Sequence, residues 1–180
     1  GVETRRTSKA RDSRWPEFAL VIDTETTTDA RQTLTAGAFR FCRLGQHYVC
    51  IEEGFFYADD IEEVQPDALT ILRDYVDSHT AETPDGLPKK IRLLSRSEFL
   101  EEVFWPVVLN PPHGAGGLVV AFNMPFDLSR LAVDCLEARR RHEGWSLVLS
   151  QDTDPATAMV RENPLRPRLI ITAKDSKAAF

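Results

Sequence analysis

Long apolar runs, a signal-peptide pattern and a phosphate-binding loop are all missing from this sequence. No stretch of about 18 consecutive apolar residues occurs, which excludes an ordinary transmembrane helix. The N-terminus is polar and basic, so we expect no signal peptide and no membrane partner. The stretch HGAGG, residues 113–117, lacks the Lys and Ser or Thr of a P-loop. No Ser, Cys or His stands in a recognisable nucleophile motif, so hydrolase chemistry of that kind has little support.

Cysteine is scarce. The three cysteines, Cys42, Cys50 and Cys135, are odd in number and do not have the spacing of metal ligands. Each lies in an apolar stretch of the sequence. We therefore expect reduced thiols in the core of a cytoplasmic protein.

An excess of positive charge is missing as well. The chain has 22 basic and 28 acidic residues, a net charge of −6 at pH 7, which argues against a protein that coats nucleic acid by electrostatic attraction alone. Basic residues nevertheless form local clusters. We interpret each cluster as solvated surface, and the alternative interpretation is a surface that contacts phosphates. These clusters are the segment 1–14; Lys89, Lys90, Arg92 and Arg96; Arg139–Arg141; and Arg161, Arg166 and Arg168.

The length of 180 residues and a hydrophobic content of 42% suit one globular domain with a sizeable core. Residues 1–15 have no periodicity and are predicted to be a flexible basic arm. Residues 16–180 are predicted to form the domain. Because the last residues, LIITAKDSKAAF, have the pattern of an unfinished strand, we expect the domain to be incomplete and the native chain to continue past Phe180.

Hydrophobic periodicity predicts an α/β fold, with one mixed sheet flanked by helices. Predicted strands are 18–24, 35–43 and 48–57, which form an antiparallel meander, then 118–122 and a hairpin of 145–150 with 168–173. Predicted helices are one after Pro66, one from Ser95 with a capping-box Glu98, and one that begins at Asn123 and reaches the arginines at 139–141. Pro106 is expected to kink or end the second helix. Loops are predicted at 110–117 and 152–166.

Two acidic side chains, Asp23 and Glu25, follow the first apolar strand. Residues two apart in a strand point to the same face, and neighbouring like charges repel. One explanation is that the strand simply ends here and both carboxylates face water. The neighbouring threonines fit a polar loop of this kind. The other is that a cation offsets the repulsion.

A third carboxylate, Asp127, follows the strand 118–122 in the same way. It has an ordinary explanation too, because acidic residues interact favourably with the first turn of a helix, and Asn123 and Pro125 are common at helix starts. If the strands 18–24 and 118–122 are neighbours, however, Asp127 comes close to Asp23 and Glu25 at the sheet edge where α/β folds bind ligands. Three such carboxylates require cations to stay ionised together.

Mg²⁺ or Mn²⁺ are the cations that prefer oxygen ligands of this kind. Two such ions about 3.5–4 Å apart are suited to in-line displacement at phosphorus, where one activates water and the other stabilises the leaving oxygen. The sequence therefore indicates a two-ion site for phosphodiester hydrolysis.

The same residues carry a resemblance to a family. VIDTETTTD, residues 21–29, resembles the first motif of the DEDD superfamily of 3′→5′ exonucleases, and VVAFNMPFDLSRL, residues 119–131, resembles the second. This group includes DnaQ-like and family B proofreading domains. The resemblance implies a ribonuclease H-like fold, and catalytic metal ligands at Asp23, Glu25 and Asp127. It also implies substrate contacts at Thr26, Asn123 and Phe126, although Phe126 fits the core equally well.

One part of the family pattern is missing. The family has a fourth carboxylate in a third motif, where Tyr or His precedes Asp by about four or five residues and orients the attacking water. Asp152, Asp154, Asp175 and His142 do not fit this spacing. We expect the motif to lie beyond Phe180, and we expect the 180 residues alone to bind metal weakly and hydrolyse poorly.

The resemblance implies a domain that releases nucleoside monophosphates from a DNA or RNA 3′ end, single-stranded by expectation, with a polymerase or other domain possible downstream. The alternative is a non-catalytic nucleic-acid-binding or interaction module that keeps the fold. A plain α/β domain with chance carboxylates is the third interpretation.

Overall fold

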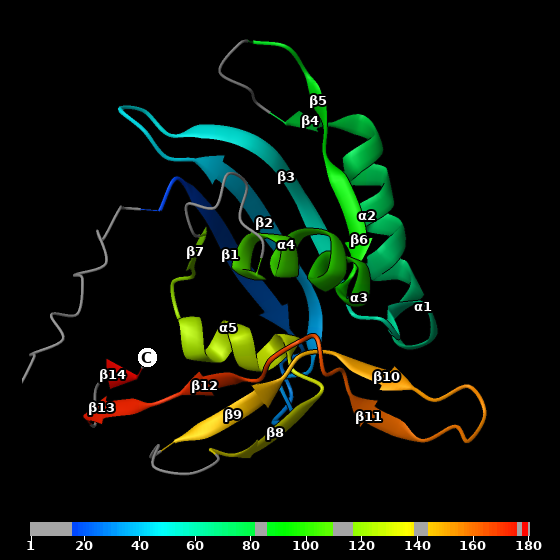
Figure 1. Ribbon diagram of the computed structural model, residues 1–180. Coiled ribbons are helices and arrows are strands. Elements are labelled where there is room, and N and C mark those ends of the chain that lie inside the picture. The colour runs from blue at the N-terminus through cyan, green and yellow to red at the C-terminus, as the bar shows by residue number, and fades with distance from the viewer. Residues whose placement is uncertain (1–15, 82–85, 110–116, 139–143, 176–177, 180) are drawn as a thin grey trace, which may run out of the picture.

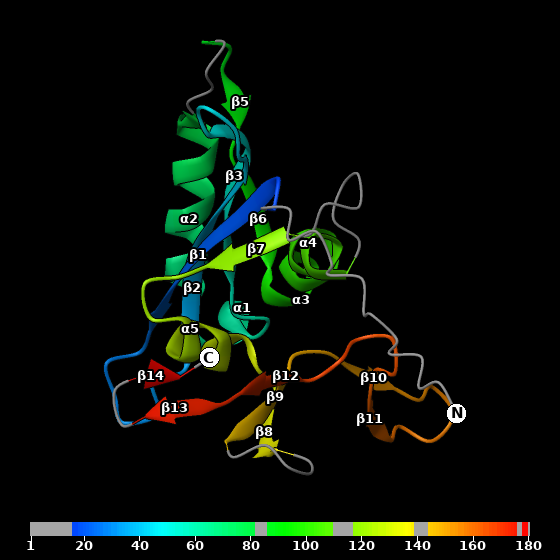
Figure 2. The same cartoon turned by 60° about the vertical axis from the view of Figure 1, so that its left-hand side comes forward.

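The computed structural model describes residues 16–81, 86–109, 117–138, 144–175 and 178–179. The predicted basic arm, most of the 110–117 loop and the arginines at 139–141 therefore lie outside the described residues. The fold is mixed α/β, as predicted. Its main feature is a five-stranded sheet in the order β6-β3-β2-β1-β7, with helices on both faces (Figures 1 and 2).

The predicted meander is confirmed. It consists of β1 (Phe18–Thr26), β2 (Leu34–Arg43) and β3 (Val49–Tyr57), and both strand pairs are antiparallel. The central part of β1 alternates between buried and exposed residues, because one face of the sheet packs on the core and the other is partly open. Gly37 in β2 is paired with Thr24, and the ring of Phe56 fills the space that a side chain at this position would need.

Two parallel strands complete this sheet. The strand β7 (Gly117–Val120) confirms the predicted strand at 118–122, and it lies parallel to β1 with Val21 opposite Val120. At the other edge, β6 (Arg92–Ser95) lies parallel to β3 and was not predicted. The only sequence signal for β6 is the short apolar run Ile91, Leu93 and Leu94.

Helices cover both faces of the sheet. The short α1 (Ile61–Val64) and the predicted α2 (Pro66–Ser78) follow β3, and α2 packs Val76 against Ile91 beside β6. On the opposite face lie α3 (Arg96–Phe99), a π-helical turn η1 (Leu100–Phe104) and α4 (Trp105–Leu109) (Figure 2). The predicted capping box is confirmed, because Ser95 accepts from the Glu98 amide and Glu98 accepts from the Ser95 amide.

Pro106 does not end its helix. It lies in the first turn of α4, and the helix continues to Leu109. The π-helical turn η1 directly precedes it. A π turn changes which carbonyls are paired, so it accommodates a residue that has no N–H to donate.

The predicted helix from Asn123 to the arginines is much shorter than expected. Helix α5 (Met124–Leu131) stops after eight residues, and Ala132 adopts an extended conformation. Cys135 and Leu136, which fit the helical stripe in the sequence, lie instead in β8 (Asp134–Glu137). The reason is a tertiary one, because β8 pairs antiparallel with β9 (Trp145–Val148).

A second, three-stranded sheet has the order β12-β9-β8. The predicted hairpin is confirmed in the pairing of β9 with β12 (Leu169–Ile171). The predicted loop between them contains an unpredicted hairpin, β10 (Gln151–Thr153) with β11 (Val160–Glu162). Two further short pairs are β4 (Thr80–Ala81) with β5 (Lys89–Lys90), and β13 (Ala173–Asp175) with β14 (Ala178–Ala179).

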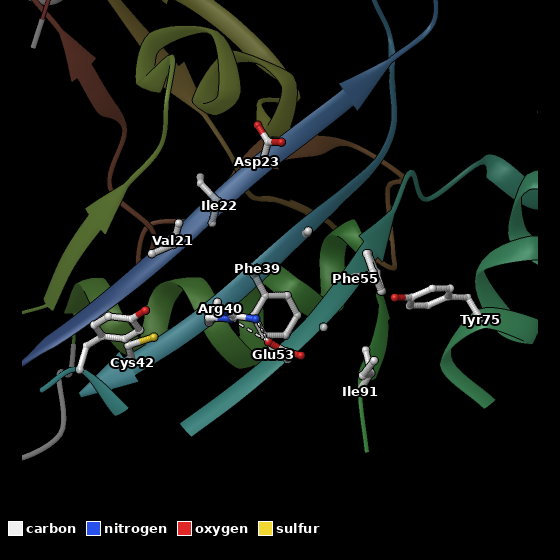
Figure 3. Close-up of a pocket in the computed structure, with 13 residues that line it drawn as sticks. Val21, Ile22, Asp23, Phe39, Arg40, Cys42, Glu53, Phe55, Tyr75 and Ile91 are labelled. Carbon is white, nitrogen blue, oxygen red and sulfur yellow. Dashed lines mark hydrogen bonds and ion pairs between the residues drawn. The ribbon is translucent and has the colours of Figure 1, made fainter. Parts of the chain in front are cut away.

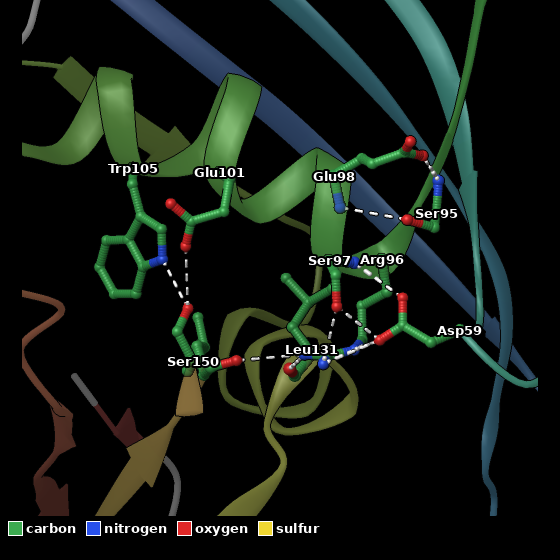
Figure 4. Close-up of polar contacts among 10 residues, drawn as sticks. Asp59, Ser95, Arg96, Ser97, Glu98, Glu101, Trp105, Leu131 and Ser150 are labelled. Carbon is green, nitrogen blue, oxygen red and sulfur yellow. Dashed lines mark hydrogen bonds and ion pairs between the residues drawn. The ribbon is translucent and has the colours of Figure 1, made fainter. Parts of the chain in front are cut away.

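One core joins the two sheets, with α5 between them (Figure 1). The polar contacts at this junction centre on Arg96, which donates to the carbonyls of Leu131 and Leu149 at 2.8 and 3.1 Å and pairs with Asp59 (Figure 4). Trp105 Nε1 donates to Ser150 Oγ at 2.9 Å. The main core residues are Leu20, Ile22, Phe39, Phe56, Phe99, Leu100, Phe104, Trp105, Leu128, Leu131, Leu147 and Leu149.

The cysteines are free, but the expectation of three core thiols is wrong for one of them. Cys42 is buried, Cys50 is half-buried and Cys135 is exposed on β8. Within the described part of the chain, no helix has the length and apolar character needed to cross a membrane.

Candidate functional site

The first predicted motif lies at the carboxyl end of β1, the neighbour of the edge strand β7 in the main sheet. Asp23 and Glu25 are exposed, and Thr24 between them is buried at 8% exposure. The alternation of the strand therefore places the two carboxylates on one face and Thr24 on the other. A change of register between Glu25 and Thr26 then ends the regular pairing with β2.

Asp127 meets β1 at Thr24. Its Oδ1 accepts hydrogen bonds from the hydroxyl of Thr24 at 2.7 Å and from the Thr24 amide at 3.2 Å. Its Oδ2 accepts from the Asn123 amide at 3.3 Å. With 3% exposure, Asp127 is one of very few buried polar residues of the described chain. The two predicted motifs are thus in direct contact, through the residue that separates the first two carboxylates.

A second contact fixes α5 to the loop that follows β1. Arg130 donates to the carbonyls of Arg31 and Gln32 at 3.2 and 2.6 Å. Within that loop, Thr27 Oγ1 donates to the Asp29 carboxylate at 2.6 Å and accepts from the Thr33 amide. Helix α5 therefore holds both the end of β1 and its loop.

The predicted substrate-contacting residues surround this junction. Thr26 is half-buried at the end of β1. Asn123 is exposed at the N-cap position of α5, as predicted, but its side chain makes no capping hydrogen bond. Phe126 is half-buried, and the Arg130 guanidinium lies 4.8 Å from the centre of its ring. Phe122, just before the helix, is fully exposed.

A groove runs along the open face of the meander and includes Asp23 (Figure 3). Its volume is about 630 Å³, within the range of small-molecule sites. Val21 and Phe55 contribute to its apolar floor, and Tyr75 of α2 forms a wall. The Phe55 and Tyr75 rings meet edge to face with centroids 5.5 Å apart. The groove offers an aromatic surface beside one of the predicted metal ligands.

One ion pair crosses the groove floor. Arg40 of β2 and Glu53 of β3 are paired at 2.5 Å, directly opposite each other in the register. The hydrogen bond to Glu53 raises the pKa of Arg40 above its ordinary value. Because this arginine is already paired, the groove carries a net negative charge from Asp23, which favours a cation there.

The donor set for a metal ion is divided between two sides of β1. Asp23 and Glu25 share one face, whereas the Asp127 carboxylate is engaged with Thr24 on the other. Among the residues that the structure describes, no three His, Cys, Asp or Glu side chains are grouped so that they could hold a metal ion. With the side chains in these positions, Asp23 and Glu25 are the two predicted ligands that could bind a cation together.

Sequence reasoning missed the roles of Thr24 and Arg130. The signal for Thr24 is its position, because a residue between two exposed residues of a strand must face the core. A buried threonine there needs a hydrogen-bond partner, and Asp127 provides one. No sequence signal identifies the backbone contacts of Arg130.

Comparison of the chain with known protein families, with curated proteins and with solved structures finds no match.

Proposed function

We propose that this chain is a metal-dependent 3′→5′ exonuclease domain of the DEDD type, with a ribonuclease H-like fold. It would hydrolyse the terminal phosphodiester of single-stranded DNA or RNA and release a nucleoside monophosphate. The observation that carries the proposal is the contact of Asp127 with Thr24, which joins the two motifs at the carboxyl ends of the neighbouring parallel strands β1 and β7. That edge is where α/β sheets bind their ligands.

The sheet topology supports the same proposal. A three-stranded antiparallel meander is followed by a parallel strand beside its first strand, with helices on both faces. This arrangement agrees with what the resemblance to the exonuclease family implies. It also brings together two motifs that are 103 residues apart in the chain.

The residues present account for only part of the metal site. Asp23 and Glu25 would hold an Mg²⁺ or Mn²⁺ ion on the open face of β1, where the ion offsets their mutual repulsion. Divalent ions supply activated water and stabilise the leaving oxygen in such reactions. For Asp127 to join this set, its carboxylate would have to leave Thr24 and reach the face of β1 that carries Asp23 and Glu25. In its present position it aligns the second motif with the first.

A second candidate function is favoured by that position of Asp127. The Asp127 carboxylate accepts three hydrogen bonds from protein groups, and these bonds give it a structural role that needs no metal ion. The corresponding proposal is a non-catalytic nucleic-acid-binding or interaction module that keeps the fold without the reaction. The two candidates differ in whether Asp23 and Glu25 bind a divalent ion.

Titration with Mn²⁺ separates the candidates, with calorimetry as the measurement. We expect weak but saturable binding to the 180-residue protein, and a loss of affinity of at least about tenfold in Asp23→Asn and in Glu25→Gln. Asp67→Asn is the matched control, because Asp67 is an exposed carboxylate in the first turn of α2. Unchanged Mn²⁺ affinity in Asp23→Asn would rule out the exonuclease proposal.

Oligonucleotides test the substrate. Single strands labelled at the 5′ end, with free or blocked 3′ ends, are incubated with the protein and Mn²⁺. The proposal expects slow shortening of the free 3′ end alone, and none with Asp23→Asn. Binding of the strands without a divalent ion and without shortening would favour the non-catalytic module.

A further inference from the structure

Two cysteines are paired across β2 and β3, and one of them, Cys42, lines the groove. In the strand register, Cys42 of β2 is opposite Cys50 of β3. A β-bulge creates this pairing, because the register passes from Phe41 opposite Glu52 to Cys42 opposite Cys50 and skips Ile51. Regular pairing would place Ile51 opposite Cys42. Bulges re-aim side chains in this way, and here the result is a pair of thiols.

Cys42 and Cys50 are paired residues of neighbouring strands, so their thiols are near each other. The Cys50 thiol donates a hydrogen bond to the Glu52 carbonyl at 3.6 Å. Residues opposite each other in an antiparallel pair have Cα atoms about 4.5–5.5 Å apart, which is within the range that a disulfide spans. The strand register therefore brings the two cysteines to the separation at which a disulfide can form.

The two thiols differ in access. Cys42 is 4% exposed and Cys50 is half-buried, so a reagent from solvent meets Cys50 first. Burial raises the pKa of both thiols, and the positive charge of Arg40 opposes this shift at each of them. Cys135 is exposed and lies on β8, in the other sheet. Cys135 therefore serves as an internal control, because it is a thiol with no cysteine opposite it in the strand register.

We propose that Cys42 and Cys50 are a modification site that forms a reversible intrachain disulfide by exchange with a low-molecular-weight disulfide such as oxidised glutathione. The Cys50 thiolate attacks one sulfur of the small disulfide and releases one small thiolate. The Cys42 thiolate then attacks the Cys50 sulfur and releases the second. The cysteine pair loses two electrons, and the small disulfide gains them. The two protons from the cysteines end on the two small thiols.

The test uses the native 180-residue protein with a series of ratios of oxidised to reduced glutathione. Free thiols are then blocked with N-ethylmaleimide, and the protein is digested with trypsin. Arg40, Arg43 and Arg73 place Cys42 in the peptide 41–43 and Cys50 in the peptide 44–73. We expect these two peptides to become linked as the ratio rises, and to separate again when reduced glutathione is in excess.

Variants test the order of the two steps. Cys42→Ser should keep Cys50 as a stable mixed disulfide with glutathione, because the second attack is lost. Cys50→Ser should leave Cys42 reduced, because Cys42 is shielded from the reagent. Cys135→Ser should still form the link. The proposal is wrong if the wild-type peptides 41–43 and 44–73 stay unlinked at ratios that oxidise the urea-unfolded chain, or if links to Cys135 form equally well. This result does not depend on nuclease activity.

Discussion

Thr24 and Asp127 are 103 residues apart in the chain, and their side chains share a hydrogen bond of 2.7 Å. Thr24 is the residue that alternation turns away from Asp23 and Glu25. The second motif therefore reaches the first from the core side of the sheet, while Asp23 lines the groove on the other side. This contact has consequences for stability that are independent of any reaction.

Replacing Thr24 with Val should lower the free energy of unfolding by about 1–3 kcal/mol, because the buried Asp127 carboxylate loses a donor. Urea denaturation measures the change. Thr70→Val is the control, because Thr70 lies on the exposed side of α2 and its replacement should change stability by less than about 0.5 kcal/mol. Asp127→Asn combined with Thr24→Val should cost less than the sum of the single changes, because the two side chains interact directly. Additive effects would show that the contact does not contribute to stability.

Gly37→Ala should destabilise the centre of the sheet. A Cβ atom at Gly37 would lie 2.2 Å from the Phe56 ring and 2.6 Å from the Asp23 carbonyl. Such overpacking typically costs about 1–3 kcal/mol. Gly45→Ala is the matched control, because the nearest atom to its Cβ is the His47 carbonyl oxygen at 3.5 Å, an ordinary contact. Equal melting temperatures for the two variants would contradict the packing seen at Gly37.

Arg96→Ala should destabilise the junction of the two sheets far more than the loss of an exposed ion pair. The variant leaves the carbonyls of Leu131 and Leu149 and the Asp59 carboxylate without this donor, and each hydrogen bond to a charged group is worth about 1.5–3 kcal/mol. Arg73→Ala removes an exposed pair with Glu62, worth about 0–1 kcal/mol. Similar unfolding midpoints for the two variants would show that the Arg96 network is not a structural junction.

Stability should fall at alkaline pH because of the cysteine pair. Burial raises the pKa of both Cys42 and Cys50, with Glu53 raising and Arg40 lowering both pKa values. A raised pKa means that the folded state holds its protons to higher pH than the unfolded state, so stability decreases as pH rises above about 8.5. Denaturation at pH 7.5 to 9.5 with a reducing agent measures this effect. The double variant Cys42→Ser, Cys50→Ser should show a smaller decrease, and an identical decrease would assign the effect to other groups.

The parts of the fold that depend on local pattern could be predicted from the sequence. The meander, α2 and the capping box at Ser95 all follow from alternation, helical spacing and short-range hydrogen bonds. The pairing of the two motif-bearing strands entered the sequence analysis only as a condition, and the parallel register of β1 with β7 meets it.

The parts that depend on distant partners could not be predicted. The apolar residues Leu128, Leu131 and Cys135 have the spacing of one long helix. Residues Asp134–Glu137 form the strand β8 instead, because they pair with β9. The short strand β6 has too few residues to show a period. The packing of α5 determines the side of β1 from which Asp127 approaches. This packing cannot be predicted from a local sequence pattern.

Because β7 follows β1 by about 90 residues in the chain, the parallel pairing of the two strands can form only late in synthesis. When the ribosome has completed residue 100, both carboxylates of Asp23 and Glu25 have been made, and the meander can begin to form from contacts close in sequence. Asp127 and the strand before it do not yet exist. Until they emerge, β1 is an uncovered edge strand and Thr24 has no carboxylate to bind, so the assembly of this junction belongs to a late stage of the growing chain.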